Sequence, residues 1–155
     1  MADPAQSLGL PVSRMSEPTD SRNRVFHVLM VEDEETLRTP VAKILQRHGF
    51  RVHEAADGGA AIAFYRAKAA EIDIVLLDMT LPSMCGSDVL SELQLIRSDV
   101  KVILTSARDR QSVMDCVIGQ RPWGYIQKPY PPSELAELLR TACSGEERAR
   151  AAGAL

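Results

Sequence analysis

The sequence IVLLD at residues 74–78 decides the fold of this chain, because it is an unbroken apolar run that ends in a carboxylate. Such a run is typical of a strand that is buried on both faces, as strands are in a parallel sheet. An aspartate is rarely buried unless it is paired or bound to a cation. We therefore expect Asp78 at the carboxyl end of its strand, where doubly wound α/β folds place their ligand sites.

Strand and helix patterns alternate on both sides of this stretch. Further strands are expected at residues 25–31, 50–54, 100–104 and 124–126. Apolar residues recur at helical spacing between them, over residues 37–45, 62–69, 87–97, 109–118 and 135–142. Five strand–helix alternations predict an α/β fold with a parallel sheet and helices on both faces.

Several helix ends can be assigned from residue type. Asp57 and Ser133 are expected to cap the amino ends of two helices, and Gly49 is expected to follow the end of the first helix. Pro40 lies inside that first helix, where it removes a backbone donor and costs about 3 kcal/mol unless it falls in the first turn or at a kink. The apolar spacing still predicts a helix here, and it does not fix the first helical residue.

Composition excludes several classes of function. The chain has 155 residues, enough for one domain with a core, and 45% of them are hydrophobic. A net charge of −3 gives no electrostatic reason to expect nucleic acid or an anionic membrane as a partner. No apolar stretch approaches the roughly 20 residues of a membrane span, and the first residues lack the basic start and apolar centre that are typical of a secretory signal. Three cysteines without a CxxC motif argue against a disulfide framework or a zinc site, so we expect a cytoplasmic protein.

Three regions are predicted along the chain. Residues 1–23 contain three prolines and no sustained periodicity, which predicts a flexible N-terminal extension. The folded domain is expected over residues 24–143. Residues 144–155 are charged and rich in alanine, and they are expected to form a frayed C-terminal tail.

Acidic residues follow two of the expected strands. Right-handed crossovers bring the carboxyl ends of all parallel strands to one edge of the sheet, so Glu32, Asp33 and Asp78 should meet there. Three converging carboxylates repel one another unless a cation lies between them. Carboxylate oxygens with space left for water suit Mg²⁺. The sequence therefore predicts a magnesium site at this edge.

The same edge receives Thr105 and Ser106 from the fourth strand and Lys128 from the fifth. A hydroxyl and an ammonium form a positive half-site opposite the carboxylates. The two halves together suit a phosphoryl group, with the metal holding some oxygens and Thr105 and Lys128 holding others. Asp78 is the expected acceptor, because a carboxylate can attack phosphorus and form an acyl phosphate.

Four motifs connect these residues to a known family. They are VEDE at residues 31–34, LLDMTLPSMCG at 76–86, TS at 105–106 and YIQKPY at 125–130. Thr105 follows Asp78 by 27 residues, and Lys128 follows Thr105 by 23. Each motif alone is weak, but all four in this order on an α/β pattern are specific. From about residue 25 to residue 143 the chain resembles the receiver domain of two-component response regulators.

The resemblance implies a role for each residue that would meet the phosphoryl group. Asp78 matches the phosphoacceptor, and Thr105 and Lys128 match the residues that contact the phosphoryl oxygens. Tyr125 matches the switch aromatic, which turns inward when the hydroxyl of Thr105 moves toward the phosphate.

The resemblance also implies the metal ligands. Asp33, Asp78 and the backbone carbonyl of Thr80 match the residues that ligate Mg²⁺, and Glu32 matches a residue that acts mainly through a bound water.

Finer features of the fold are implied in the same way. The five-stranded sheet is expected in the flavodoxin-like order 2-1-3-4-5, and the Lys128–Pro129 bond is expected to be cis. Residues 120–123, Gln-Arg-Pro-Trp, make the segment before Tyr125 longer and bulkier than is usual in the family. Trp123 is expected to serve in packing or in a partner surface.

The implied function is that of a phosphorylation-controlled signalling module of a two-component phosphorelay. It takes a phosphoryl group from phosphohistidine and is no enzyme beyond self-catalysed transfer and autodephosphorylation. Its expected partners are a histidine kinase or histidine phosphotransfer domain and a downstream protein. The downstream protein is expected to bind the face formed by the fourth helix, the fifth strand and the last helix. The chain is expected as a monomer or a phosphorylation-dependent dimer, either stand-alone or excised from a larger protein such as a hybrid kinase.

Three other functions compete with this reading. Haloacid-dehalogenase-type phosphatases also place an aspartate nucleophile at a strand end, but they use Asp-x-Asp, and Thr80 stands at the second position here. A receiver-like docking module without phosphorylation is disfavoured by the intact set of acids, hydroxyl and lysine. Nucleotide binding is weaker still, because no glycine-rich phosphate loop follows the first strand.

Overall fold

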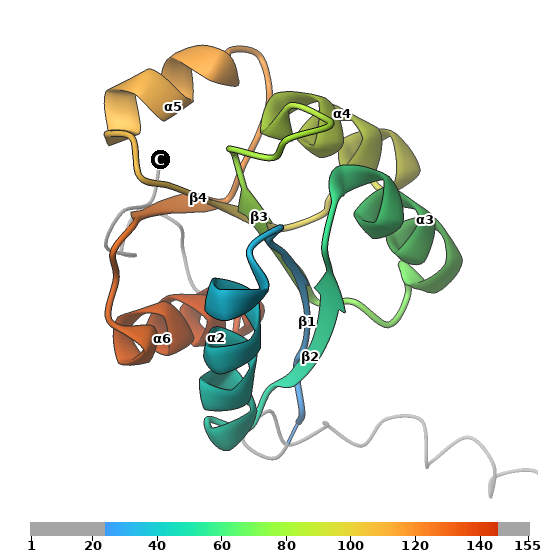
Figure 1. Cartoon of the computed structure of the whole chain (residues 1–155). Coiled ribbons are helices and arrows are strands. Elements are labelled where there is room, and N and C mark those ends of the chain that lie inside the picture. The colour runs from blue at the N-terminus through green and yellow to red at the C-terminus, as the bar shows by residue number, and fades with distance from the viewer. Residues whose placement is uncertain (1–23, 146–155) are drawn as a thin grey trace, which may run out of the picture.

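Strands and helices alternate along residues 24–145, the part of the chain that the computed structural model describes. The strands are β1 (His27–Val31), β2 (Arg51–Ala55), β3 (Ile74–Asp78), β4 (Val102–Ser106) and β5 (Gly124–Gln127). The helices are α2 (Glu35–Arg47), α3 (Gly58–Lys68), α4 (Gly86–Ile96), α5 (Arg110–Cys116) and α6 (Pro132–Cys143) (Figure 1). The predictions for residues 1–23 and for the end of the tail, 146–155, lie outside the described residues.

The five strands form one parallel sheet in the order β2-β1-β3-β4-β5. Helices α2 and α6 cover one face of the sheet, and α3, α4 and α5 cover the other (Figure 1). The predicted doubly wound α/β fold, the strand order and the placement of helices on both faces are therefore confirmed.

The central strand β3 is buried along its whole length, as its apolar run predicts. Because side chains alternate across a strand, Val75 and Leu77 join the core beneath α3, α4 and α5. Ile74 and Leu76 join the second core, beneath α2 and α6. Trp123 lies in that second core and is 8% exposed, so its predicted packing role is confirmed.

Two of the predicted helix ends agree with the structure. Asp57 accepts a hydrogen bond from the backbone N–H of Ala60 (2.7 Å) and caps α3. Gly49 follows α2 with φ +94°, a conformation that glycine adopts without strain. Helix α2 begins at Glu35 and continues through Pro40.

The predicted cap at Ser133 is wrong. Helix α6 begins at Pro132, two residues earlier than a cap at Ser133 predicts, and no side chain caps it. A proline in the first helical turn has φ already set for the helix and lacks an N–H that would have no partner there. The tandem prolines therefore set the start of this helix, and the serine falls inside it.

No helix among residues 24–145 is long and apolar enough to cross a membrane.

Gly86 allows α4 to begin directly against the loop after β3. A Cβ atom at this position would lie 2.7 Å from the Cα of Met79 and 3.2 Å from the carbonyl oxygen of Asp78. These are backbone atoms, which cannot move aside as a flexible side chain can. The glycine therefore fixes the close approach of α4 to the end of the strand that carries Asp78.

We expect Gly86→Ala to lower the free energy of unfolding by about 2 kcal/mol, because the added methyl group overpacks backbone. Gly59→Ala is the matched control in the first turn of α3, since a Cβ there meets only the Asp57 carboxylate, at 3.4 Å. The control should be neutral or stabilising by up to about 1 kcal/mol, because alanine favours a helix over glycine. Urea unfolding measures both variants, and equal stabilities would contradict the packing role of Gly86.

Candidate functional site

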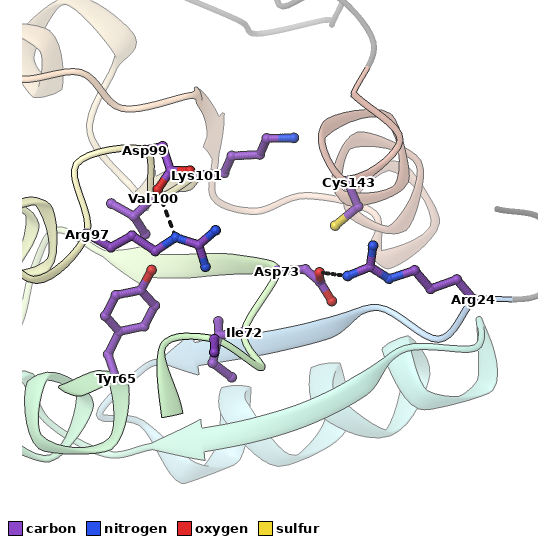
Figure 2. A pocket seen from close by; sticks show the side chains of 10 residues that line it. Arg24, Tyr65, Ile72, Asp73, Arg97, Asp99, Val100, Lys101 and Cys143 are labelled. Carbon is purple, nitrogen blue, oxygen red and sulfur yellow. Dashed lines mark hydrogen bonds and ion pairs between the residues drawn. The ribbon is translucent and has the colours of Figure 1, made fainter. Parts of the chain in front are cut away.

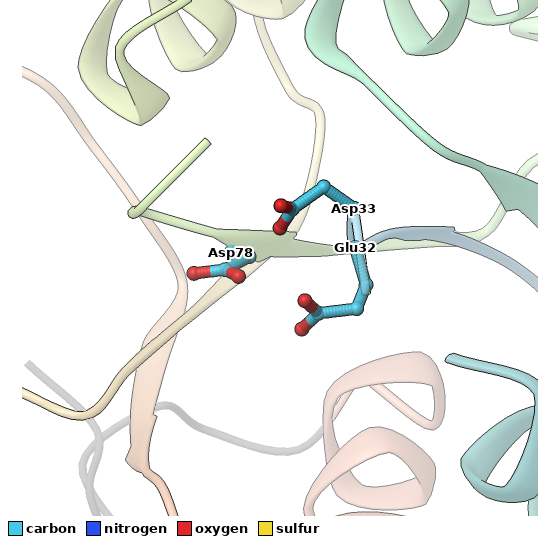
Figure 3. Close-up of side chains that lie close together, drawn as sticks. All are labelled: Glu32, Asp33 and Asp78. Carbon is cyan, nitrogen blue, oxygen red and sulfur yellow. The ribbon is translucent and has the colours of Figure 1, made fainter. Parts of the chain in front are cut away.

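Three carboxylates converge at the carboxyl ends of β1 and β3. Glu32 and Asp33 directly follow β1, and Asp78 is the last residue of β3. One oxygen from each of the three lies within 4.8 Å of the others, and Figure 3 shows the three side chains turned toward one another. Glu32 and Asp78 are buried, whereas Asp33 is exposed. The structure thus brings together the acidic residues that the sequence predicts as a cluster.

Lys128 joins two of these carboxylates. Its ammonium lies 2.6 Å from Oε2 of Glu32 and 3.1 Å from Oδ2 of Asp78. The backbone N–H of Lys128 donates to the carbonyl of Ser106 (2.8 Å), which holds the loop after β5 against the end of β4. The predicted cis bond between Lys128 and Pro129 is confirmed.

Burial and the neighbouring charges have opposite effects on the pKa values of Glu32 and Lys128. Burial raises the pKa of Glu32 above its usual value, and the hydrogen bond from Lys128 opposes that shift only in part. Burial alone would lower the pKa of Lys128, but the hydrogen bond to Glu32 and the charge of Asp78 outweigh it, so this pKa is raised. Three carboxylates and one ammonium leave a formal charge of −2 at the site, which a divalent cation would balance.

Two threonines lie beside Asp78. The backbone N–H of Thr80 donates to Oδ1 of Asp78 (2.8 Å), so both oxygens of this carboxylate have a partner. Thr105 is opposite Asp78 in the β3–β4 register. Its hydroxyl is buried and has no hydrogen-bond partner among the described residues. Buried hydroxyls are normally hydrogen-bonded. Because the hydroxyl of Thr105 has no such partner among the described residues, it is available to bond to an oxygen brought to the site.

Tyr125 does not join the carboxylates. It lies on β5, is 4% exposed, and its hydroxyl donates to the backbone carbonyl of Arg108 in the loop after β4. Burial raises the pKa of Tyr125, which keeps the hydroxyl protonated as a donor. The ring therefore occupies an inward position beneath the loop that follows Thr105.

Two hollows open at this edge of the sheet. One has a volume of about 480 Å³ and is lined by residues that include Asp33, Asp78, Thr80 and Lys128. The other has a volume of about 330 Å³ and lies beside it, between α2 and the loop after β5. We call it the apolar groove, and its apolar lining residues are Leu37, Val41, Ala107, Pro129 and Tyr130. The sequence patterns did not predict this groove, because its residues are scattered over three segments.

A further cavity of about 310 Å³ lies near the amino ends of β3 and β4 (Figure 2). Its charged groups are largely satisfied within the chain, because Arg24 pairs with Asp73 and Arg97 pairs with Asp99. It shares no residue with the carboxylate cluster.

Comparison with known proteins identifies the family. The sequence model of the response regulator receiver domain family matches residues 28–140 of this chain. The sensory transduction protein RegX3 of Mycobacterium tuberculosis is 47% identical over 116 residues, which are 73% of this chain and 48% of RegX3. The chemotaxis protein CheY of Thermotoga maritima is 34% identical over 113 residues, which are 72% of this chain and 92% of CheY.

A solved structure agrees with these sequence matches. The CheX–CheY–BeF3–Mg complex from Borrelia burgdorferi contains a chain with a TM-score of 0.67 and 33% identity, covering 79% of this chain and 90% of that one. The chain spans about half the length of the RegX3 proteins that it matches.

We expect Lys128→Met to lower the free energy of unfolding by about 2 kcal/mol in the presence of a chelator, because Glu32 and Asp78 stay buried without their shared counterion. Added Mg²⁺ should recover part of this loss, since a cation among the carboxylates replaces the missing charge. Urea unfolding with EDTA and with excess Mg²⁺ measures both effects.

Lys101→Met is the matched control. The ammonium of Lys101 is also partly buried, but it donates to the neutral carbonyl of Ala142 (2.6 Å). The stability of this variant should depend on Mg²⁺ no more than that of the wild type. An equal dependence on Mg²⁺ in both lysine variants contradicts the role given to Lys128.

Proposed function

The chain belongs to the response regulator receiver domain family, and we propose that it is a phosphorylation-controlled module of a two-component phosphorelay with Asp78 as its phosphoacceptor. Receiver domains are signalling modules and not classical enzymes. The proposal rests on one observation: the buried carboxylate of Asp78 pairs with the ammonium of Lys128 and is opposite Thr105 in the β3–β4 register, where the buried hydroxyl of Thr105 has no partner among the described residues.

Asp78 is held ready to act as a nucleophile. Thr80 and Lys128 each donate to one of its oxygens, which fixes the orientation of the carboxylate. In the transfer, an oxygen of Asp78 forms a bond to phosphorus while the bond from phosphorus to the histidine nitrogen breaks, and the nitrogen keeps the electron pair. Lys128 and Thr105 then donate hydrogen bonds to the phosphoryl oxygens.

The acidic residues fit a magnesium ion. Glu32, Asp33 and Asp78 offer only oxygen ligands, which is the donor set that Mg²⁺ prefers. We assign Asp33, Asp78 and the backbone carbonyl of Thr80 as its direct ligands, with Glu32 acting through a water. When bound, the ion supplies positive charge that offsets both the carboxylates and the phosphoryl oxygens.

Thr105 and Tyr125 carry the signal in this proposal. A phosphoryl group on Asp78 gives the Thr105 hydroxyl its missing partner, and the loop above Tyr125 follows that hydroxyl. The affected surface is formed by α5, β5 and α6, and a downstream protein or a second phosphorylated copy binds there. The CheX–CheY–BeF3–Mg complex supports binding of a partner protein by analogy, since a related receiver forms a complex with a second protein in the presence of BeF3 and Mg.

We expect Asp78→Asn to abolish labelling of the chain by radioactive acetyl phosphate in Mg²⁺, because an amide cannot form the acyl phosphate. Asp88→Asn, which changes an exposed acid in the first turn of α4, is the matched control and should label like the wild type. Unchanged labelling of the Asp78 variant contradicts the phosphoacceptor assignment. A wild type that is labelled by neither acetyl phosphate nor any phosphorylated histidine kinase favours the unphosphorylated docking module.

The apolar groove supports a place for the phosphohistidine donor. It shares Glu32 and Lys128 with the phosphoryl site, and Leu37 on its wall is 41% exposed. A helix with an apolar stripe beside its phosphohistidine can fill the groove and bring phosphorus to Asp78. We therefore propose that the histidine kinase or phosphotransfer domain docks there.

We expect Leu37→Ala to slow phosphoryl transfer from a histidine kinase that phosphorylates the wild type by about tenfold, because a buried interface side chain is lost. Labelling by acetyl phosphate should not change, since the small donor needs no docking surface. Leu95→Ala is the control, because Leu95 lies on α4 away from the groove and is 79% exposed. Equal loss with both phosphodonors contradicts the docking role.

A further inference from the structure

We infer that Arg38 is a positioning residue for Asp33, and that it acts through the peptide bond between Glu32 and Asp33. This inference rests on the proposed function of the site, since it concerns how one of the magnesium ligands is held. Arg38 stands outside the four sequence motifs and does not line the cavity at the carboxylates.

Arg38 reaches from α2 to the ends of two strands. Its Nη1 donates to the carbonyl oxygen of Glu32 (2.8 Å), at the end of β1. Its Nε donates to Oε1 of Glu54 (3.1 Å), on the neighbouring strand β2. The side chain of Arg38 is only 15% exposed, and these two bonds fix its guanidinium.

The carbonyl that Arg38 holds belongs to the peptide unit between the two acids. That unit is planar, so holding its oxygen fixes the direction in which the chain enters Asp33. On the other side of Glu32, the backbone N–H donates to the carbonyl of Ala55 (3.1 Å). The backbone at Glu32 is therefore held from both sides, by β2 and by Arg38.

Asp33 depends on this backbone more than the other two acids do. The side chains of Glu32 and Asp78 are held by Lys128, and backbone N–H groups also donate to them. The side chain of Asp33 is exposed and makes no hydrogen bond or ion pair with the described residues, although it faces the other two carboxylates (Figure 3). Its position is set by the backbone, and Arg38 holds that backbone.

The charge of Arg38 can be separated from its geometry. Glu54 already neutralises the guanidinium, so Arg38 adds little net charge at the carboxylates. A lysine keeps the charge, but its ammonium is a compact point charge on a flexible stem and lacks the rigid planar fork by which arginine holds a carbonyl and a carboxylate at fixed positions. Arg38→Lys should therefore behave like Arg38→Ala if position matters, and like the wild type if charge matters.

The test is the Mg²⁺ dissociation constant, measured by isothermal titration calorimetry without any phosphodonor. We expect Arg38→Ala to raise it about tenfold, as loss of an outer-shell support does at metal sites, and Arg38→Lys to raise it nearly as much. Glu54→Gln keeps the fold and an acceptor but loses the ion pair, and it should raise the constant by a smaller factor. Wild-type affinity in Arg38→Ala, or full rescue by lysine, overturns the inference.

Arg97→Ala is the matched control at the opposite end of the sheet. Arg97 makes the same two kinds of bond, from Nε to Oδ1 of Asp99 (2.8 Å) and from Nη1 to the carbonyl of Ala69 (3.1 Å). Figure 2 shows Arg97 beside Asp99. Its loss should leave the Mg²⁺ constant unchanged, and an equal weakening in both arginine variants overturns the positioning role.

Labelling of Asp78 separates this inference from the proposed function. A wild type that binds Mg²⁺ but is never labelled refutes the phosphoacceptor role, while the arginine series still decides the role of Arg38. A labelled wild type whose Mg²⁺ affinity is unaffected by Arg38→Ala refutes the positioning role alone. A wild type that binds no Mg²⁺ also overturns the positioning role, because Asp33 is then no magnesium ligand for Arg38 to position.

Discussion

The ammonium of Lys128 between Glu32 and Asp78 is the interaction on which this edge of the sheet depends. Two buried carboxylates at the ends of adjacent strands cannot stay ionised without a counterion. The counterion comes from the loop after β5, 96 residues away from Glu32 in the chain. The single ammonium thereby ties the first, third and fifth strands together at their carboxyl ends, and the β-sheet topology is what brings them there.

Sequence patterns predict the strands and helices well here because each pattern is local. The apolar run of β3 needs only its own residues to be read as a buried strand, and it is one in the structure. The strand order could not come from periodicity, since it depends on contacts between distant segments, and it was predicted only from the family resemblance. The wrong prediction of a cap at Ser133 has a local cause. Serine favours the N-cap position and proline favours the first helical turn, and the preference of Pro132 prevailed.

The candidate site also has residues that the sequence predicts and a residue that it does not. The meeting of Glu32, Asp33, Asp78 and Lys128 follows from parallel strands that share one edge, so the residues could be predicted before their distances were known. Arg38 could not be predicted, because its partners are a backbone carbonyl and a glutamate on another strand. The only sequence signals are an arginine in the second turn of α2 and an acid at the end of β2, and both are common on protein surfaces. A residue that supports a site through the backbone leaves little trace in a motif.

Lys128 and Thr105 differ in whether they already have hydrogen-bond partners, and this difference decides which of them can bond to a new group without breaking an existing bond. Lys128 already has two carboxylate partners, so a phosphoryl group on Asp78 must compete for its hydrogen bonds. The hydroxyl of Thr105 has no partner among the described residues, and an unpaired buried hydroxyl costs about 1–3 kcal/mol. A phosphoryl oxygen within its reach relieves that cost without breaking any bond that the hydroxyl makes with the described residues. In the proposed function, Thr105 therefore gains more than Lys128 from phosphorylation of Asp78. We propose that this gain drives the movement of the loop that Tyr125 holds through the carbonyl of Arg108.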